Sequence, residues 1–540
     1  METHVRNHLF YLSALTLLLF FTGLGARDFW APVEPRYAEI ARIMFAKGEW
    51  IVPTVNGDLY TDKPILYFWL VLIASKIAGA VNEWTVRLPA ALGGIGFVLT
   101  TYLIGRDFYN PRVGLVAAAV LATSVRVIWE ARWAHIDMVF GLFFLLTIFF
   151  GARSLLHKGS KNEVLLAYVF MALAVLSKGL IGVVLPALVL TVFIIVRRDW
   201  RVLIEARLAL GVPIFLLIAA PWFYWVSSVT DGKWLADFIY VHHIQRYTDG
   251  NGHRKSFYYY LTTLPVDFMP WTTFAIPAVF AYFPYRQIRQ QAHSLFFFLC
   301  FAVVFLFFSI SDTKRDLYLL PLLPSLALFL GNYVDDLTEG RLPRSTLYRW
   351  LGQLFFGAAA IAGLALPVVL WFTRPEIFWL SLPAAMVLTM GAILTVLFIR
   401  RHQPLKAVAS AALLMTSVML CVSLSILPYV DRLKSPRPFS LQIKKLVPPA
   451  APLYIYADTM NDFNYYTERE SIPVLSSSGE VAQASRQHGE GYLLIKERDL
   501  AKIGVLDREQ IVTTGTVGST IWYLVSLNEL SETLSVPWES

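Results

Sequence analysis

The sequence predicts an α-helical polytopic membrane protein with a small α/β domain at its C-terminus. Of its 540 residues, 56% are hydrophobic and 16% are charged, so the chain has too little polar surface for a soluble globule of this size. Long apolar runs recur from residue 8 to residue 427. Beyond residue 428 they give way to polar sequence that is punctuated by prolines.

The charge and the cysteines exclude two other classes. The formal net charge is +8, but Lys and Arg are scattered among short loops where membrane topology requires them, so nucleic acid is not an expected partner. The two cysteines, Cys300 and Cys421, lie far apart within apolar runs. They predict neither a disulfide framework nor a cysteine metal site.

The apolar runs predict about thirteen transmembrane helices. The first run lacks a clear cleavage site after it, so we interpret it as a retained span. The predicted spans lie near residues 8–25, 88–105, 113–128, 136–153, 163–176, 179–196, 207–226, 264–283, 295–310, 317–334, 350–372, 378–399 and 406–427.

The basic residues predict the orientation of these spans. If the apolar stretch 64–81 also crossed the membrane, every later basic loop would lie outside, against the positive-inside rule. We therefore expect 64–81 to lie along the outer interface, where Tyr67 and Trp69 suit the headgroup level. The N-terminus is then cytoplasmic, and residues 26–87 form a first periplasmic loop with interfacial helices, within a transmembrane domain of residues 1–427.

Residues 428–540 are predicted to form a separate periplasmic α/β domain. Four prolines between residues 436 and 449 mark a linker. Short β-like runs follow at residues 453–456, 492–495 and 521–525, separated by polar turns.

Several ionisable residues are placed by this topology at the outer ends of spans. Asp137 starts one apolar span, and Lys178 separates two others with almost no loop. An ionisable group at this depth costs about 2.5–3.5 kcal/mol on insertion scales, so it lines a cavity or pairs with a partner. A structural Asp–Lys pair and a snorkelling lysine are the alternatives to a functional site. For the charges of the first loop, the alternative is a solvated loop.

A cluster of cations beside an apolar cavity suits a phosphate that is carried on a lipid. Carboxylates beside the cations suit a general base or a divalent metal ion such as Zn, Mg or Mn. Charge alone fits a lipid-phosphate transporter equally well. We find no glycine-rich phosphate loop and no Rossmann fingerprint, so a nucleotide site is not expected.

Six motifs in the first two thirds of the chain add a family resemblance. The motifs are residues 34–40 (EPRYAEI), 62–69 (DKPILYFW) with 84–89 (WTVRLP), 135–137 (HID), 177–179 (SKG), 243–246 (HIQR) and 314–321 (KRDLYLLP). Together they resemble, in order, the lipid A aminoarabinose transferase family, which is related to protein O-mannosyltransferases and belongs to the GT-C class of polyprenyl-phosphate-sugar-dependent enzymes.

The resemblance implies a GT-C fold and a sugar donor that is linked to undecaprenyl or a similar polyprenyl phosphate. It also implies roles for residues at the matching positions. The donor phosphate would be contacted by Lys63, Lys178 and Arg246, with Arg36, Tyr318, Lys314 and Arg315 helping to form its site; a candidate divalent-metal site would use Asp62 and His243; the catalytic carboxylates would be Glu34 and Asp137.

One position departs from the family pattern, since Val33 stands where the family usually has Asp before Glu34. Either Glu34 or Asp137 takes the role of that acid, or the reaction needs no strong base. An acceptor phosphate is already a nucleophile, whereas a hydroxyl needs its proton removed.

We therefore predict an inverting membrane glycosyltransferase of the bacterial inner membrane. It is expected to move a sugar from a polyprenyl phosphate to a lipid A, glycan or protein acceptor on the periplasmic side. A protein O-mannosyltransferase and a non-catalytic transporter of lipid-linked glycans are the alternatives.

Overall fold

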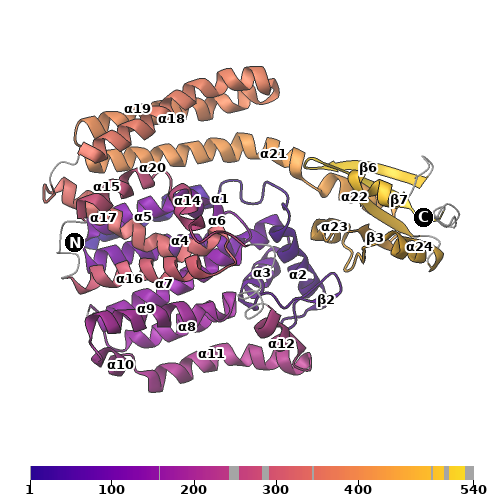
Figure 1. Ribbon diagram of the computed structural model, residues 1–540, viewed down its shortest axis with the longest axis horizontal. Coiled ribbons are helices and arrows are strands. Elements are labelled where there is room, and N and C mark those ends of the chain that lie inside the picture. The colour runs from indigo at the N-terminus through magenta and orange to yellow at the C-terminus, as the bar shows by residue number, and fades with distance from the viewer. Residues whose placement is uncertain are drawn as a thin grey trace. The chain divides into compact units, whose positions relative to one another are not determined.

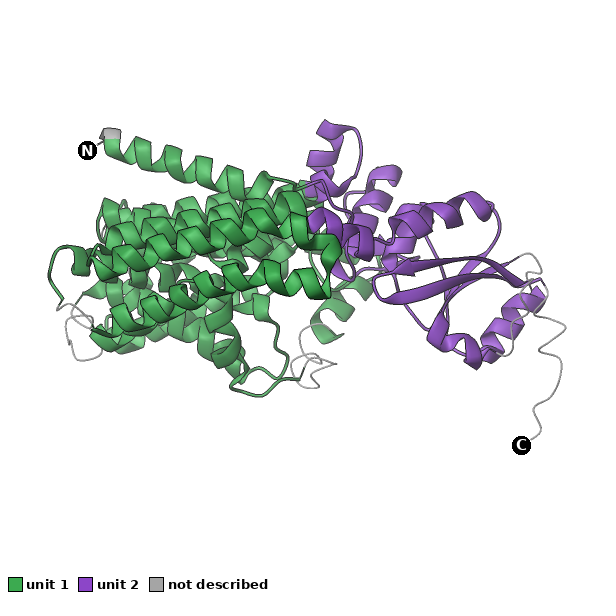
Figure 2. Cartoon of the chain, turned by 90° about the horizontal axis from the view of Figure 1, so that it is seen from above, with its two compact units in different colours: residues 1–24, 61–70, 87–426 green, residues 25–60, 71–86, 427–540 purple. Residues whose placement is uncertain are grey.

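The chain folds into two compact units, each assembled from separate stretches of sequence (Figure 2). The computed structural model describes residues 2–156, 158–241, 254–282, 291–342, 346–487, 491–503 and 510–528. Unit 1 comprises residues 1–24, 61–70 and 87–426, and unit 2 comprises residues 25–60, 71–86 and 427–540. The first loop predicted from the sequence thus contributes most of its residues to the unit that contains the C-terminal region.

Unit 1 is a bundle of helices (Figure 1). In it α7 packs along α8, α5 along α17, and α18 along α19. Two of the helices below, α3 and α4, begin or end in unit 2. The helices are α1 (Glu2–Phe21), α3 (Leu66–Ala78), α4 (Glu83–Phe108), α5 (Pro111–Ala122), α6 (Val125–Ala131), α7 (Ile136–Leu155), α8 (Glu163–Lys178), α9 (Ile181–Arg197), α10 (Arg201–Glu205), α11 (Leu208–Val229), α12 (Lys233–Ile239), α14 (Tyr259–Asp267), α15 (Thr272–Tyr282), α16 (Ala292–Ile310), η3 (Asp316–Leu322), α17 (Leu323–Thr338), α18 (Thr346–Thr373), η4 (Pro375–Ile377), α19 (Phe378–Arg400), α20 (Pro404–Cys421) and η5 (Val422–Ile426).

Within the described residues, eight helices are long and apolar enough to cross a membrane, or up to ten if each of two bent helix pairs is one span. The chain is therefore a multi-pass membrane protein. The other three predicted spans coincide with α1, α8 and α9, so a helix or a bent pair lies at each of the thirteen predicted ranges. The helix α3 has 13 residues and is about 20 Å long, too short for a hydrocarbon core of about 30 Å.

The bent pairs matter for the site because they introduce backbone breaks into apolar segments. The axes of α5 and α6 differ by 67°, and those of α14 and α15 by 115°. At the first break, Thr123 Oγ1 donates to the Ala119 carbonyl and Ser124 Oγ to the Val120 carbonyl, at 2.6 and 2.7 Å. The Thr123 amide also donates to the Ala119 carbonyl and the Ser124 amide to the Leu121 carbonyl, so backbone and side-chain donors share the carbonyls at the end of α5.

Close helix packing in unit 1 relies on glycine at the contact between α4 and α5. A Cβ atom added to Gly105 would lie only 2.4 Å from the Gly114 Cα. Only a residue without a side chain fits on either side, as is typical of helix contacts in membranes, where packing replaces the hydrophobic drive.

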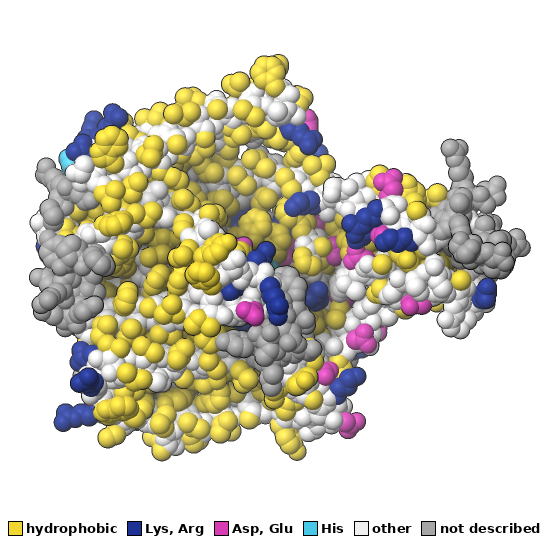
Figure 3. Space-filling model, in the orientation of Figure 1, with side chains coloured by type: hydrophobic (Ala, Val, Ile, Leu, Met, Phe, Trp, Pro, Cys, Tyr) yellow, Lys and Arg dark blue, Asp and Glu magenta, His cyan; other side chains and the backbone are white. Residues whose placement is uncertain are grey.

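The outer surface of unit 1 is apolar. Figure 3 shows hydrophobic side chains over most of its visible face. Around the turn between α18 and α19, Trp371, Phe372 and Trp379 are all more than half exposed. Exposed aromatic side chains at the ends of apolar helices suit the membrane–water interface.

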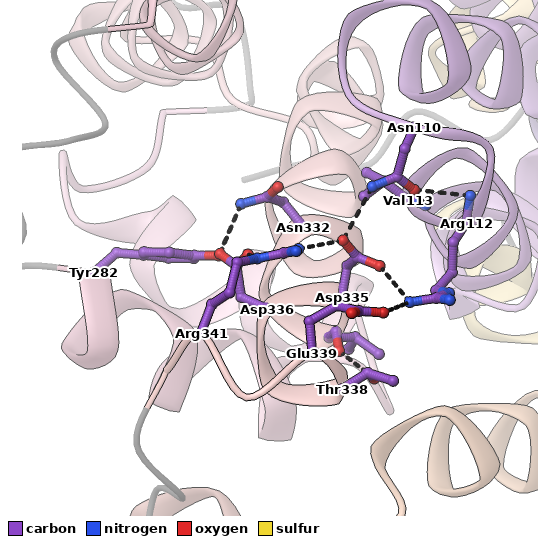
Figure 4. A network of polar contacts seen from close by, with 11 residues as sticks. Asn110, Arg112, Val113, Tyr282, Asn332, Asp335, Asp336, Thr338, Glu339 and Arg341 are labelled. Atoms are coloured by element: carbon purple, nitrogen blue, oxygen red, sulfur yellow. Dashed lines mark hydrogen bonds and ion pairs between the residues drawn. The ribbon is translucent and has the colours of Figure 1, made fainter.

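A polar network ties the C-terminal end of α17 to α5 and α15 (Figure 4). The buried Asp335 accepts hydrogen bonds from Asn110 Nδ2 at 3.0 Å and Arg112 Nη1 at 3.1 Å, and also pairs with Arg341. The neighbouring Asp336 accepts from the Tyr282 hydroxyl. The carboxylates are thus paired where the helix leaves the apolar bundle.

Unit 2 contains a five-stranded mixed sheet with strand order β4-β3-β5-β7-β6. In it β3 is parallel to both β4 and β5, whereas β5, β7 and β6 pair antiparallel. The strands predicted at 453–456, 492–495 and 521–525 are β3, β5 and β7, while β4 and β6 were not predicted. The elements are α2 (Val33–Lys47), β1 (Thr54–Val55), β2 (Asp58–Leu59), α21 (Leu427–Lys434), α22 (Arg437–Leu446), β3 (Leu453–Tyr456), α23 (Asn461–Thr467), β4 (Val474–Leu475), α24 (Ser478–Gln487), β5 (Tyr492–Lys496), η6 (Glu497–Lys502), β6 (Ile511–Val517) and β7 (Thr520–Ser526).

Within unit 2, the first-loop segment is bound to residues about 400 positions later. The Phe29 amide donates to the Tyr466 hydroxyl at 2.8 Å, and the Trp30 indole donates to Asp431 at 2.7 Å. The Asn56 side chain accepts from the Ile472 amide at 2.7 Å. In addition, α2 packs against α23. The first loop therefore owes its fold to the C-terminal region.

The buried Asp462 predicts how the stability of unit 2 depends on pH. Burial raises the pKa of the Asp462 carboxyl from 3.8 to about 7, and its Oδ2 has no hydrogen-bond partner among the described residues. The folded state therefore binds a proton that the unfolded state releases, so stability falls as the pH rises from 3.8 to about 7. We expect Asp462→Asn to raise the melting temperature at about pH 8 and to flatten this slope, measured by tryptophan fluorescence.

Asp499→Asn is the matched control. Lys502 Nζ lies 2.7 Å from Asp499 Oδ1 and lowers the pKa of that carboxyl, which therefore titrates below the same window. A slope that persists in the Asp462→Asn protein would contradict the assignment.

Candidate active site

One largely buried cation of unit 1 is Lys178, the last residue of α8. The helix ends there because Gly179 follows with a φ of 85°, a conformation that glycine adopts readily. A lysine in the last turn is favoured by the partial negative charge of the helix C-terminus. Its side chain is 10% exposed.

Three groups from two other elements surround this lysine. Its ammonium forms an ion pair with Asp137, in the first turn of α7. It also lies 4.8 Å from the centre of the Tyr318 ring, on η3, and 5.0 Å from that of Phe140. The structure thus brings together Asp137, Lys178 and Tyr318, three of the residues predicted from the sequence. The structural Asp–Lys pair is thus present, and the phosphate-binding role of the lysine stays a prediction.

The geometry leaves Lys178 able to bind an anion. An ammonium has three N–H donors, and Asp137 engages it on one side, while the two aromatic rings stabilise the charge without accepting a conventional hydrogen bond. A phosphate oxygen is a stronger acceptor than either ring.

A second charged network is centred on Arg126 and includes the first residue of η3 and the residue before α7. The guanidinium of Arg126, on α6, donates to Asp267 at 2.6 and 3.0 Å, to Glu130 at 3.1 Å and to Asp316 at 3.1 Å. The other oxygen of Glu130 lies 2.6 Å from His135 Nδ1. Glu130 and Asp267 are buried.

The sequence analysis did not select Arg126, Glu130 or Asp267. Their signal was nevertheless present, because all three lie within or beside predicted apolar spans, where ionisable groups are costly. Arg126 and Glu130 also have the i,i+4 spacing that places them on one helix face.

The predicted metal ligand Asp62 pairs with its neighbour Lys63. Lys63 Nζ lies 2.8 Å from Asp62 Oδ1 and 2.9 Å from the Asp62 carbonyl, and both side chains are 19% exposed. The described residues contain no group of three or more His, Cys, Asp and Glu side chains that could hold a metal ion. His243 and Arg246 lie outside the described residues, so the metal site and this phosphate contact stay predictions.

Glu34 and Arg36 belong to α2 of unit 2. The Glu34 carboxylate is fully buried and accepts two hydrogen bonds from Arg27, at 2.6 and 3.0 Å. Arg36 is half-buried and has no ion-pair partner in the part of the chain that the structure describes.

The remaining predicted cations lie just before η3. Lys314 is buried, and its ammonium donates to the Ser311 carbonyl and, at 3.2 Å, to the Lys255 carbonyl. It therefore supports the chain between α16 and η3. The carbonyl of Arg315 accepts from the Tyr260 hydroxyl at 3.1 Å.

Comparison with known proteins finds similar membrane glycosyltransferases. The sequence profile of the dolichyl-phosphate-mannose-protein mannosyltransferases matches residues 62–225. An undecaprenyl phosphate-alpha-4-amino-4-deoxy-L-arabinose arabinosyl transferase of Shewanella sediminis is 28% identical over 518 residues, covering 92% of this chain and 90% of its own. The corresponding enzyme of Pectobacterium carotovorum is 31% identical over 371 residues, covering 66% of this chain and 65% of its own.

Solved structures agree on the fold. The crystal structure of ArnT from Cupriavidus metallidurans bound to undecaprenyl phosphate matches with a TM-score of 0.77 at 23% identity, covering 98% of both chains. The chain therefore has the GT-C fold of membrane glycosyltransferases. The likeness extends to the archaeal oligosaccharyltransferase AglB of Archaeoglobus fulgidus, which matches with a TM-score of 0.56 at 11% identity over 92% of this chain and 69% of that one.

These matches confirm the resemblance inferred from the six motifs. Three of the six motifs, 62–69 with 84–89, 135–137 and 177–179, fall inside the profile match. As in the prediction from sequence, the GT-C glycosyltransferase consists of membrane helices followed by a small mixed-sheet region.

The ion pair of Lys178 and Asp137 predicts a specific pattern of stability. Lys178→Met leaves a buried carboxylate without its partner, which costs about 3–5 kcal/mol. Replacing both charges, in Lys178→Met/Asp137→Asn, removes the unpaired charge and should recover most of that loss. Apparent melting temperatures of the purified proteins measure both effects, and equal values for the single and double variants would show that the pair is not buried in the native protein.

Proposed function

We propose that this enzyme transfers a 4-amino-4-deoxy-arabinose unit from undecaprenyl phosphate to lipid A at the periplasmic face of the inner membrane. The observation that carries the proposal is the buried Lys178, held by Asp137 and Tyr318 in a bundle of membrane helices. Two arabinosyl transferases, which are aligned with this chain over 90% and 65% of their own lengths, support the choice of donor and sugar.

The reaction is a single displacement at the anomeric carbon. The bond from this carbon to the donor phosphate oxygen breaks, its electron pair stays on that oxygen, and an acceptor oxygen forms the new bond from the opposite face. Lys178 stabilises the negative charge that grows on the leaving phosphate. Losing one preorganised contact of this kind typically lowers the rate about 10²–10³-fold.

The other predicted residues take supporting roles in the same proposal. Lys63 and Arg246 would complete the positive charge around the phosphate, and Tyr318 would orient Lys178 toward it. The same proposal assigns Arg36, Lys314 and Arg315 to the margin of the phosphate site, and Asp62 and His243 to a divalent-metal site.

The carboxylates support an acceptor that needs no strong base. Asp137 is ion-paired with Lys178, and Glu34 accepts two hydrogen bonds from Arg27, so both carboxylates already have cationic partners within the protein. Val33 supplies no further acid. A phosphate group of lipid A attacks as an anion without proton removal, which fits this set of residues.

Replacing Lys63, Lys178 or Arg246 by Ala should lower transfer at least tenfold, because each removes one positive charge from the leaving phosphate. The measurement is transfer by purified enzyme from the undecaprenyl-phosphate-linked aminosugar to lipid A, followed by mass spectrometry. Lys161→Ala, an exposed lysine of a predicted cytoplasmic loop, is the control. Wild-type transfer by the Lys178→Ala protein would remove that residue from the site.

The profile match at residues 62–225 favours one second candidate, a protein O-mannosyltransferase. Mass spectrometry of lipid A, surface glycans and envelope proteins from cells with and without the gene separates the two. Modified envelope proteins with unchanged lipid A would favour the second candidate, and unchanged samples of all three kinds would favour a transporter.

The proposed topology has thirteen spans, a cytoplasmic N-terminus and a periplasmic C-terminal region. In a background without Cys300 and Cys421, we expect Ala80→Cys and Ser476→Cys to react with an impermeant thiol reagent added from outside. Lys161→Cys should react only after permeabilisation. All three positions are exposed. Protection of Ala80→Cys in intact cells would mean that α3 crosses the membrane.

A further inference from the structure

We propose that Arg126 is a positioning residue that holds two elements of the Lys178 site in register. The inference rests on the proposed function, because it takes Lys178 as the group that binds the donor phosphate. No contact among the described residues joins Arg126 to Lys178, so Arg126 acts through the segments that carry Tyr318 and Asp137.

The first of these segments is η3. Arg126 Nη2 lies 3.1 Å from Asp316 Oδ2, and Asp316 is the first residue of η3. The Tyr259 hydroxyl donates to the other oxygen of the same carboxylate. Tyr318 follows two residues later and places its ring 4.8 Å from the Lys178 ammonium. The position of this ring therefore depends on how Asp316 is held.

The second segment is the start of α7. Arg126 Nη1 lies 3.1 Å from one oxygen of Glu130, whose other oxygen lies 2.6 Å from His135 Nδ1. His135 is the residue that precedes α7, and Asp137 follows in its first turn. The same guanidinium therefore fixes the residue before the helix whose carboxylate pairs with Lys178.

Asp267 anchors the guanidinium itself. It accepts from Arg126 Nε at 3.0 Å and from Nη2 at 2.6 Å, and it is the last residue of α14. The Asp267 side chain is 6% exposed and that of Glu130 is 1% exposed. Removing the cation from carboxylates so poorly solvated would leave buried charge without compensation, which is strongly destabilising.

The arrangement requires an arginine rather than any cation. One guanidinium faces three carboxylates from three elements, and its planar fork of five N–H donors can address all three at once. A lysine ammonium at this position would be a compact charge on a flexible stem, and it could not pair with all three carboxylates at once. Arg126 also sits on α6, which the break at Ser124 turns away from the axis of α5.

The experiment compares Arg126→Gln and Arg126→Lys with a matched control, Arg153→Gln. Arg153 lies in the last turn of α7 and also pairs with two carboxylates, those of Asp107 and Glu163. Its side chain is 23% exposed, close to the 15% of Arg126. If Arg126 positions the site, both of its variants should lower kcat about 10–100-fold, the range for residues that orient a reacting group, while Arg153→Gln keeps kcat within about threefold.

A double-mutant cycle with Lys178→Met separates positioning from stability. A residue that acts only through Lys178 adds little once Lys178 is gone, so Arg126→Lys should cost less than about threefold in the Lys178→Met background. Rates are normalised to the folded fraction, so a loss that merely reflects less folded protein disappears.

Additive losses in the cycle, or an Arg126→Lys protein with wild-type kcat, would overturn the inference while leaving the phosphate role of Lys178 intact. Wild-type transfer by the Lys178→Met protein would instead remove the proposed phosphate site, and the role of Arg126 with it. Weaker retention of undecaprenyl phosphate by Arg126→Lys than by Arg153→Gln, measured by equilibrium binding to the purified proteins, would support the inference independently of turnover.

Discussion

A lysine ammonium inside a helical bundle needs nearby groups that balance its charge, because water does not solvate it there. The arrangement of α7, α8 and η3 follows from this constraint. The side chain of Lys178 is only 10% exposed, so water solvates its ammonium poorly. Its charge is instead balanced by Asp137 and by the faces of two aromatic rings. The desolvation cost of the lysine is therefore met before any ligand arrives, and an anion that enters finds a cation already in place.

The need to balance poorly solvated charges also explains where the other buried ionic groups lie. The continuous segment formed by η3 and α17 has a network around Arg126 at its start and a network around Arg112 and Arg341 at its end. In both networks arginine pairs with more than one carboxylate, as its fork of donors allows. The segment between them packs through apolar residues, among them Leu320, Leu323 and Leu330. This segment therefore packs through apolar side chains in its middle and through ion pairs at both ends.

How much of this could be predicted from the sequence depends on how local each signal is. The helices were predictable, because a run of apolar residues long enough to span a bilayer is, in a chain of this composition, almost always a membrane helix. The cluster of Asp137, Lys178 and Tyr318 was predictable from motifs and charge placement.

The Arg126 network was not predictable in the same way. Arg126 and Asp267 are 141 positions apart and meet because two apolar segments bend, at angles that hydrophobic periodicity does not reveal. The grouping of the first loop with the C-terminal region was also hidden, since it depends on individual hydrogen bonds such as that from Phe29 to Tyr466.

That long-range joining of unit 2 has a consequence for synthesis. The segment that contains Phe29 and Asn56 leaves the ribosome early, but its hydrogen-bond partners Tyr466 and Ile472 are made more than 400 residues later. Until the last fifth of the chain has been synthesised, the early segment lacks the hydrogen-bond partners that complete its fold. Its maturation is therefore post-translational, and nascent chains that stall before residue 427 present a segment that quality-control proteases can recognise.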